Sequence, residues 1–313
     1  MKTTTVWCLV IAISVLAVTE SSKRNSTEES PNERKKFLWD GPTASAFFVE
    51  GKRPVGLPDI NRGKDIQQGT PPSFVSLFDP STNTPFYSAY RVLPEQAKYI
   101  GNNTRPNAKW RNPPGVSGLN DAYKQANREA QKKYGDQLTR GHMNPSGINS
   151  FDKTYMKNTF TLANTVPQFK ASNSGPWNDF ENKIKEYAKT TCGSKTRQGT
   201  LYLLTGRSEN GLKDVPKPSI TNTFTVKTKT LSLDTPQAVW TAGCCVWKVT
   251  GKPTEEAESF AVMSNNHYDT NQLHQTEMSV NDLEKRLKAA ASKAKVDLFP
   301  GNTNCARNYH PLP

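Results

Sequence analysis

Two adjacent cysteines in a strand-like run place the strongest restriction on how this chain folds. Cys244 and Cys245 lie within residues 238–247 (AVWTAGCCVW), which are mostly apolar, aromatic or β-branched. Neighbouring side chains on a strand point to opposite faces, and a bond between them would require a strained geometry. We therefore expect Cys192 and Cys305 each to bond one member of the pair, from opposite sides of the strand. Which cysteine takes which partner stays open.

The N-terminus predicts export. Lys2 precedes an apolar segment, residues 6–18, which is typical of a secretory signal and too short to span a membrane. We expect residues 1–21 to be a signal peptide whose removal takes Cys8 with it, leaving four cysteines for two disulfides in an oxidising compartment. Zinc binding is the alternative for these cysteines, although the chain has no C-x2-C pair. No later run approaches the roughly eighteen apolar residues of a membrane span. We therefore expect a secreted, extracellular protein with no membrane partner.

The rest of the chain divides into a tail and one domain. Residues 22–36 are polar and charged without an apolar period, which predicts a disordered tail. We expect residues 37–313 to form a single domain, because no internal repeat is visible, although the length would also suit two small domains. N-glycosylation sequons begin at Asn25 and Asn102. An exported chain with these sequons is expected to be a glycoprotein.

The charge balance favours a polyanionic partner. The chain has 41 Lys and Arg residues against 28 Asp and Glu residues, a net charge of +13. Such an excess suits nucleic acid, an anionic glycan or an acidic membrane surface. A charge that only keeps the protein soluble explains the same numbers, so the composition alone does not choose. The oligomeric state also stays open.

Short apolar runs separated by Gly, Pro and Asn predict a sheet. The expected strands are residues 84–93, 159–163, 200–205, 223–233, 238–247 and 260–263. Pro94 lacks an N–H for the ladder and should end the first of them. Strands interrupted by a few helices indicate an α+β fold with a mostly antiparallel sheet flanked by helices.

Three segments have helical character. Residues 119–134 are followed by Gly135, a plausible stop. Residues 176–189 place four apolar side chains on one face at spacings of three, four and three, which indicates core packing; these are Trp177, Phe180, Ile184 and Tyr187. A capping box at residues 279–282 predicts a final helix that runs through Lys295.

The segment at residues 138–145 (LTRGHMNP) holds the first candidate site residues. Arg140 and His142 flank Gly141, and we expect a polar turn in which the glycine presents both side chains to one site. A histidine with an ordinary pKa of about 6.5 can take a proton from water. An arginine can fork onto phosphate oxygens. An isolated histidine or arginine is more often structural or exposed, so the pair needs support from other residues.

An amide and a carboxylate downstream are groups that a hard cation prefers. Asn173 stands just before the helix expected at residues 176–189, and Glu181 lies on that helix one turn before Lys185. A single amide oxygen, with a water shell held by a nearby carboxylate, suits Mg²⁺. Capping of the helix by Asn173 and a solvated position for Glu181 are the alternatives.

Together these residues resemble the DNA/RNA non-specific endonuclease family. The resemblance rests on TRGHMNP at 139–145, FTLANTVPQ at 160–168, NSGPW at 173–177 and Glu181 four residues after the tryptophan, and it covers about residues 84–265. It implies a ββα-metal nuclease fold. More loosely, residues 239–245, 279–287 and 296–301 resemble a secreted, vertebrate-type branch, the endonuclease domain-containing 1 protein-like members.

The resemblance also implies a role for each candidate residue. His142 would be the general base that activates water, and Asn173 the one direct protein ligand of a hydrated Mg²⁺, with Mn²⁺ as a possible substitute. Glu181 would support the water shell of that ion. Arg140 would stabilise charge on the phosphate, and Asn164 would position the site. A sixth residue, Lys185, stands where the family often has an arginine and would contact phosphate as a point charge.

These roles predict a secreted, Mg²⁺-dependent endonuclease that cleaves DNA and RNA with little sequence specificity. One departure from the family pattern favours an alternative. The best-known bacterial members have Asp before the Arg-Gly-His motif, where this chain has Thr139. The alternative is a secreted nucleic-acid-binding protein on the same fold with weak or no catalysis.

Overall fold

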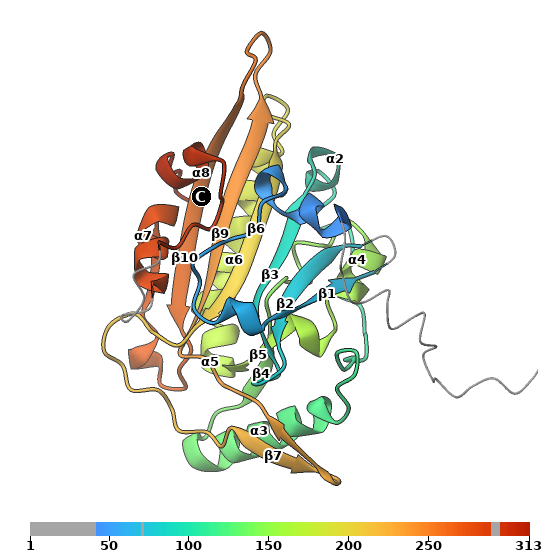
Figure 1. Cartoon of the computed structure of the whole chain (residues 1–313), viewed down its shortest axis with the longest axis vertical. Helices are drawn as coiled ribbons and strands as arrows, with labels where there is room; N and C mark the ends of the chain where they lie inside the picture. Colours follow the sequence, from blue (N-terminus) through green and yellow to red (C-terminus); the bar gives the residue numbers. More distant parts are fainter. Residues whose placement is uncertain (1–41, 70–71, 289–294) are drawn as a thin grey trace, which may run out of the picture.

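A seven-stranded antiparallel sheet forms the centre of the molecule (Figure 1). The computed structural model describes residues 42–69, 72–288 and 295–313, so the expected signal peptide (1–21) and polar tail (22–36) lie outside the described residues. The strand order is β1-β2-β3-β6-β9-β10-β11, and every neighbouring pair is antiparallel. These strands are β1 (Lys64–Gln68), β2 (Phe74–Asp79), β3 (Thr84–Val92), β6 (Thr200–Ser208), β9 (Ala238–Lys248), β10 (Glu255–Asn265) and β11 (Gln275–Met278). The expected α+β class with a mostly antiparallel sheet is confirmed.

Helices and two short ribbons surround this sheet. The ribbons pair β4 (Leu138–His142) with β5 (Thr165–Phe169) and β7 (Thr223–Val226) with β8 (Lys229–Ser232). The helices are α2 (Pro94–Ala97), α3 (Leu119–Tyr134), α4 (Lys153–Asn158), α5 (Lys170–Asn173), α6 (Pro176–Glu186), α7 (Val280–Leu287) and α8 (Thr303–Arg307). None of the helices within the described ranges is both long and apolar enough to cross a membrane.

The two faces of the sheet bury different helices. On one face, the apolar side of α6 packs against strands β6, β9 and β10 through Trp177, Phe180 and Ile184. On the other face, α7 packs through Val280 and Leu283. The side chains of β9 alternate between these two cores, as the period of two in a strand requires. The apolar stripe predicted for residues 176–189 therefore packs in the core and holds α6 against the sheet.

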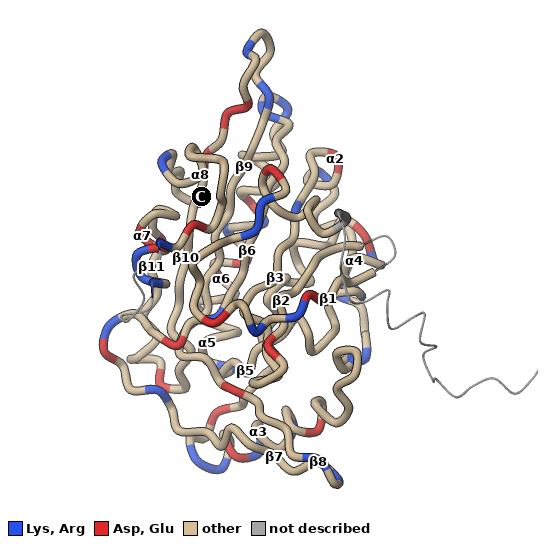
Figure 2. Tube along the Cα trace, viewed as in Figure 1, with Lys and Arg blue, Asp and Glu red and all other residues tan. Residues whose placement is uncertain are grey.

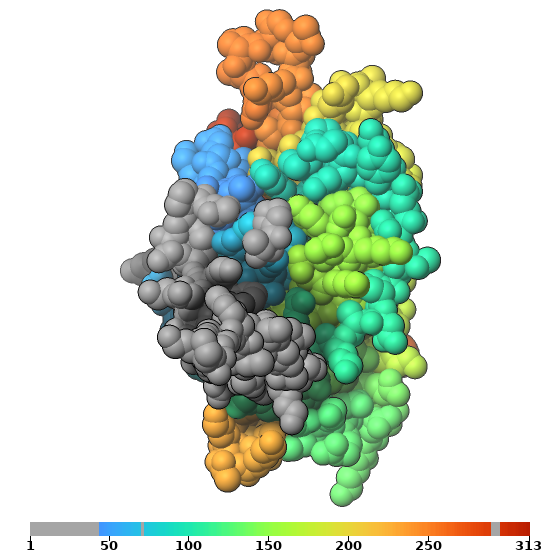
Figure 3. Space-filling model, turned by 90° about the vertical axis from the view of Figure 1, so that its right-hand side faces the viewer, coloured from blue at the N-terminus to red at the C-terminus, as the bar shows by residue number. Residues whose placement is uncertain are grey.

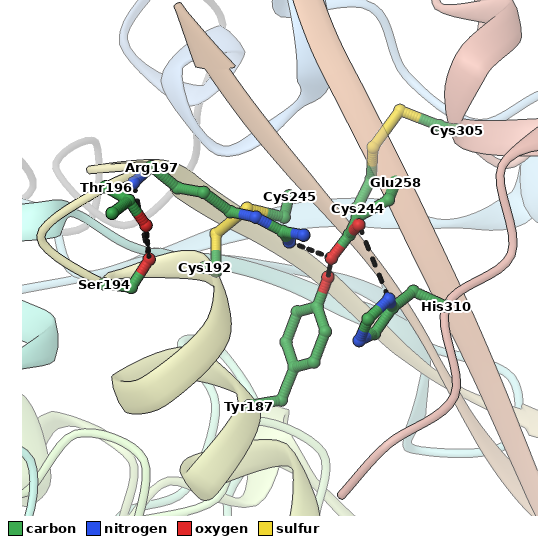
Figure 4. The surroundings of a disulfide bond; sticks show 10 residues. All are labelled: Tyr187, Cys192, Ser194, Thr196, Arg197, Cys244, Cys245, Glu258, Cys305 and His310. Carbon is green, nitrogen blue, oxygen red and sulfur yellow. Dashed lines mark hydrogen bonds and ion pairs between the residues drawn. A yellow bond between two sulfur atoms is a disulfide. The ribbon is translucent and has the colours of Figure 1, made fainter.

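The disulfides follow from the same alternation. Cys245 bonds Cys192, which follows α6, and Cys244 bonds Cys305 of α8 (Figure 4). The expectation that Cys244 and Cys245 take separate partners on opposite faces is confirmed, and the pairing that the sequence left open is now assigned. Each bridge ties one layer of helices to the central strand.

Several strand predictions were wrong in extent or place. The segment at 223–233 is a hairpin rather than one strand, because the chain turns at Lys227, which has a φ of 56°. Residues 159–163 form a turn and the start of a 3₁₀ turn, and the strand begins at Thr165. Strands β1 and β2 were not predicted. Strand β2 is buried on both faces, so its sequence shows no alternation.

The helix predictions differ mainly at their ends. Helix α3 matches the expected 119–134 and ends at Gly135, whose φ of 72° is the left-handed conformation that glycine favours. Helix α6 continues into a π-helical turn, η5 (Tyr187–Cys192), beyond the expected end at 189. Helix α7 ends at Leu287 because Lys288 is extended, so the expected run through Lys295 was too long. Only half of the expected capping box forms: the Ser279 hydroxyl accepts from the Asp282 N–H at 3.1 Å, but the Asp282 carboxylate accepts from that hydroxyl at 2.6 Å rather than from the Ser279 N–H.

Candidate active site

The ribbon of β4 and β5, followed by α5 and α6, carries the candidate site. Arg140 and His142 lie on strand β4, opposite Pro167 and Thr165 of β5. The expected polar turn was therefore wrong. On a strand, residues two apart share a face, so Arg140 and His142 point to the same side without a turn.

Gly141 serves a different purpose from the one expected. It has no left-handed conformation, but a Cβ atom at this position would lie 2.1 Å from Oε1 of Gln168. Gln168 is itself fully buried on β5. The glycine is needed because the glutamine side chain crosses the strand there, which fixes how the two strands of the ribbon pack.

His142 is held neutral by its surroundings. Its side chain is only 7% exposed and packs against the rings of Trp110 and Phe160, with centroids 4.9 and 5.2 Å away. Burial, reinforced by the positive charge of Arg105, lowers the pKa of His142 to about 3. Its buried Nε2 atom has no hydrogen-bond partner among the described residues. The imidazole thus has a free nitrogen for a group that enters the site.

Arg140 is fixed in place by neutral groups rather than by a carboxylate. One of its terminal nitrogens donates to Oδ1 of Asn120 at 2.7 Å, and its guanidinium lies 5.7 Å from the ring of Trp110 and 5.6 Å from that of Tyr123. Burial lowers the pKa of Arg140, which stays charged. No acidic side chain in the part of the chain that the structure describes pairs with Arg140, so its charge is available for an incoming anion.

A short hydrogen-bond chain orients Asn173. The hydroxyl of Thr139 donates its one proton to the backbone oxygen of Gln168 at 2.7 Å, so towards Asn173 it can only accept. It accepts from Nδ2 of Asn173 at 3.0 Å. The amide nitrogen is thereby pinned, and Oδ1 is the atom left for a ligand. Asn173 ends α5 and does not cap α6, whose N-cap position is taken by Gly175.

Glu181 and Lys185 lie one turn apart on α6, as expected. Burial raises the pKa of Glu181 to about 7, against the opposing charges of Arg105 and Lys185. Glu181 is partly buried, and a further positive charge would stabilise its ionised form. A bound metal ion would supply it and would keep the carboxylate ionised.

Asn164 lies in the protein interior and bonds the segment that follows His142. It is fully buried, and its Oδ1 accepts from the Ser88 hydroxyl at 2.9 Å and from the N–H of Asn144 at 2.8 Å. Its Nδ2 donates to the carbonyls of Asn144 and Thr159 at 3.0 and 3.1 Å. With every polar atom satisfied inside the protein, Asn164 fixes the segment that follows His142 and has none left for substrate.

Arg105 belongs to the site but was missed by sequence reasoning. It acts electrostatically on both His142 and Glu181, and its guanidinium lies 5.1 Å from the ring of Phe160. This residue comes from the Asn/Pro loop before α3, where nothing in the local sequence marks it. An arginine that approaches two candidate site residues from a third segment adds to the positive field over the site.

The residues fit a hydrated divalent cation better than a closed metal cage. Within the part of the chain that the structure describes, no three His, Cys, Asp or Glu residues gather in a way that could hold a metal ion. The site instead offers one oriented amide oxygen, on Asn173, and a partly buried carboxyl, Glu181. Mg²⁺ keeps several waters and needs few protein ligands. Asn173 would hold such an ion, and Glu181 would support its water shell.

The fold and the motifs place the chain in a known family. A family profile described as DNA/RNA non-specific endonuclease matches residues 60–292, and the chain belongs to this family. A solved structure titled "Crystal structure of the EndoG/EndoGI complex: Mechanism of EndoG inhibition" covers 76% of this chain and 87% of that chain, with a TM-score of 0.51. The identity to it is 14%, so this likeness concerns the fold alone.

Curated relatives match a limited part of the chain. "Nuclease EXOG, mitochondrial" of Xenopus laevis is 31% identical over 142 residues, which cover 44% of this chain and 36% of that protein. The protein of the same name from Mus musculus is 38% identical over 93 residues, covering 28% of this chain and 23% of its own length. The chain therefore spans about a third or less of these relatives.

Proposed function

We propose that this protein is a secreted, Mg²⁺-dependent endonuclease that hydrolyses phosphodiester bonds of DNA and RNA with little sequence specificity. The observation that carries the proposal is a buried, neutral His142 on the same strand face as Arg140; among the described residues, Nε2 of His142 has no hydrogen-bond partner and Arg140 has no acidic partner. Family membership and the nuclease names of the relatives support it. The expected signal and the two disulfides support secretion by a chain whose residues 37–313 act as one domain.

His142 takes a proton from the attacking water while the water oxygen bonds to phosphorus. The bond to the leaving sugar oxygen breaks, and that oxygen takes up a proton from solvent water. A phosphodiester anion that faces the imidazole raises its pKa, which offsets the effect of burial. Arg140 stabilises the added charge on the phosphoryl oxygens through its fork, and Lys185 contributes a point charge. Mg²⁺, or Mn²⁺ in its place, would act as a Lewis acid on those oxygens when bound at Asn173.

Nicking of supercoiled plasmid by the purified protein tests this function. We expect nicking with Mg²⁺ and its loss in EDTA, for DNA of any sequence, and a matching loss of RNA cleavage. Plasmid binding without nicking across several divalent metals would instead identify the protein as a non-catalytic nucleic-acid binder. Thr139 was the feature that favoured that alternative. The hydrogen bond between Thr139 and Nδ2 of Asn173 argues against it, because it leaves Oδ1 of Asn173 available for a metal ion.

Thr139 is expected to set metal affinity without touching the metal. Thr139→Val keeps the shape but removes the oxygen that pins Nδ2 of Asn173, so the amide is free to rotate. Loss of such a supporting partner typically costs 10–100-fold in metal affinity. We therefore expect Mn²⁺ to bind the variant about 10–100-fold more weakly in an electron paramagnetic resonance titration. Thr139→Ser, which keeps the hydroxyl, should bind near the wild-type value; equal affinity of the valine variant would refute the role.

A further inference from the structure

The β7–β8 hairpin and the exposed side of α3 form a positively charged surface that the proposed chemistry does not use. We call it the α3–hairpin patch and define it as Lys124 and Arg128 of α3 with Lys227 and Lys229 of the hairpin, all exposed. Figure 2 shows these elements at the lower end of the molecule, and Figure 3 shows the hairpin in orange beside α3 in green. The question is what this surface binds.

The hairpin is firmly anchored to α3. Phe224 and Val226 are buried in the core beneath the helix, and Nε2 of Gln125 donates to the Thr225 carbonyl at 3.2 Å. Gly118, at the start of α3, has a φ of +83°, and a Cβ there would lie 2.9 Å from Cγ1 of Val226. The apolar side of the hairpin is therefore fixed on the protein, so its lysines are held at a defined place beside α3.

The positive charge of the patch is largely uncompensated. Lys124 pairs with Asp121 at 2.8 Å, but within the described ranges no acidic side chain lies within 4.0 Å of Arg128, Lys227 or Lys229. A hydrogen bond from Lys124, with the charges of Lys124, Lys227 and Arg128, lowers the pKa of Asp121, so these cations act on one carboxylate. Lys124 and Arg128 are four residues apart on a helix, a spacing at which like charges repel. The repulsion between these cations destabilises the folded protein slightly, and a bound anion would relieve it.

The patch continues directly from the active site. Asn120, whose side chain accepts the hydrogen bond from Arg140 at 2.7 Å, precedes Lys124 by four residues on the same side of α3. Four residues of helix rise about 6 Å. The ring of Tyr123, on the same helix, lies 5.6 Å from the guanidinium of Arg140. The helix that supports the candidate phosphate-binding arginine therefore also carries the cations of the patch.

We propose that the α3–hairpin patch binds the phosphate backbone of the nucleic acid to one side of the cleaved bond. This inference rests on the proposed function, and continuity with Arg140 is what favours nucleic acid over an acidic glycan. Phosphate contacts hold a polymer in register without reading its sequence. The patch should therefore act on long substrates and not on a single phosphodiester.

A charge-neutralising variant tests the patch against a matched control. The variant is Arg128→Gln/Lys227→Gln/Lys229→Gln, and the control, Lys189→Gln/Lys195→Gln/Lys248→Gln, removes the same charge from exposed positions elsewhere. Binding to a 30-base-pair duplex is followed by fluorescence anisotropy in EDTA over a range of salt concentrations. Each lost phosphate contact reduces the slope of log affinity against log salt by about 0.9. We expect the slope to fall by about two to three in the patch variant and to stay unchanged in the control.

Cleavage of bis(p-nitrophenyl) phosphate separates this proposal from the proposed function. Both triple variants should hydrolyse this small diester at the wild-type rate, while the patch variant loses cleavage of the duplex at high salt. An unchanged salt slope in the patch variant would overturn the proposal. So would loss of heparin binding with duplex binding retained, which would make the patch a glycan surface. If the wild-type protein cleaves neither substrate, the proposed function fails, and the duplex-binding slopes still decide the patch.

Discussion

His142→Ala should abolish most cleavage while leaving the protein folded. A positioned general base contributes about 10²–10⁴-fold to a rate, and no other described imidazole lies on the strand that carries Arg140. We expect the initial rate of plasmid nicking to fall by about that factor. The variant also removes a buried nitrogen that has no partner, which limits the cost of losing the ring.

Two comparisons isolate the base from the fold. His274→Ala changes a histidine outside the site, on the loop before β11, and should nick at the wild-type rate. Thermal unfolding should show a folded His142→Ala protein, and its affinity for Mn²⁺ should stay near the wild-type value because Asn173 is untouched. A folded variant that keeps more than about a tenth of the wild-type rate would remove His142 from the role of base.

The sequence predicted the parts of the fold that local patterns encode. The apolar stripe of residues 176–189 follows the helical period and packs as expected, and the cysteine pair identified a central strand with bridges to both faces. Strand β2 was missed because both of its faces are buried, so it has no alternation to read. Local patterns succeed where one face of an element meets solvent or a chemical bond fixes the direction of a side chain.

The site was harder to predict because its geometry depends on distant residues. Gly141 looked like a turn residue, but the reason for it is Gln168, 27 positions later on the neighbouring strand. Asn173 does not cap α6, and its amide is oriented by a hydrogen bond to Thr139, 34 positions earlier. Arg105 comes from a separate loop, and its guanidinium lies 5.1 Å from the ring of Phe160. The sequence supplied the chemical groups, whereas their orientation depends on contacts between segments.

Asn173→Ala should lose the metal rather than the base. The change removes the single oriented amide oxygen, whose nitrogen is pinned by Thr139 at 3.0 Å. Since loss of a supporting partner costs 10–100-fold in metal affinity, loss of the direct ligand should cost at least about 100-fold. We expect weak Mn²⁺ binding and a nicking rate that recovers in part as the Mg²⁺ concentration rises. His142→Ala should show the opposite pattern, with normal affinity and no recovery.

Neighbouring positions supply the controls for this prediction. Asn178→Ala removes an exposed amide from α6 and should change neither affinity nor rate. Asn173→Asp keeps an oxygen for the metal but loses the N–H that Thr139 accepts, so its affinity should lie nearer the wild type than that of the alanine variant. A folded Asn173→Ala protein that binds Mn²⁺ like the wild type would mean that the ion is held elsewhere. In that case Oδ1 of Asn173 would contact the substrate instead, because Thr139 bonds the other polar atom of that side chain, Nδ2.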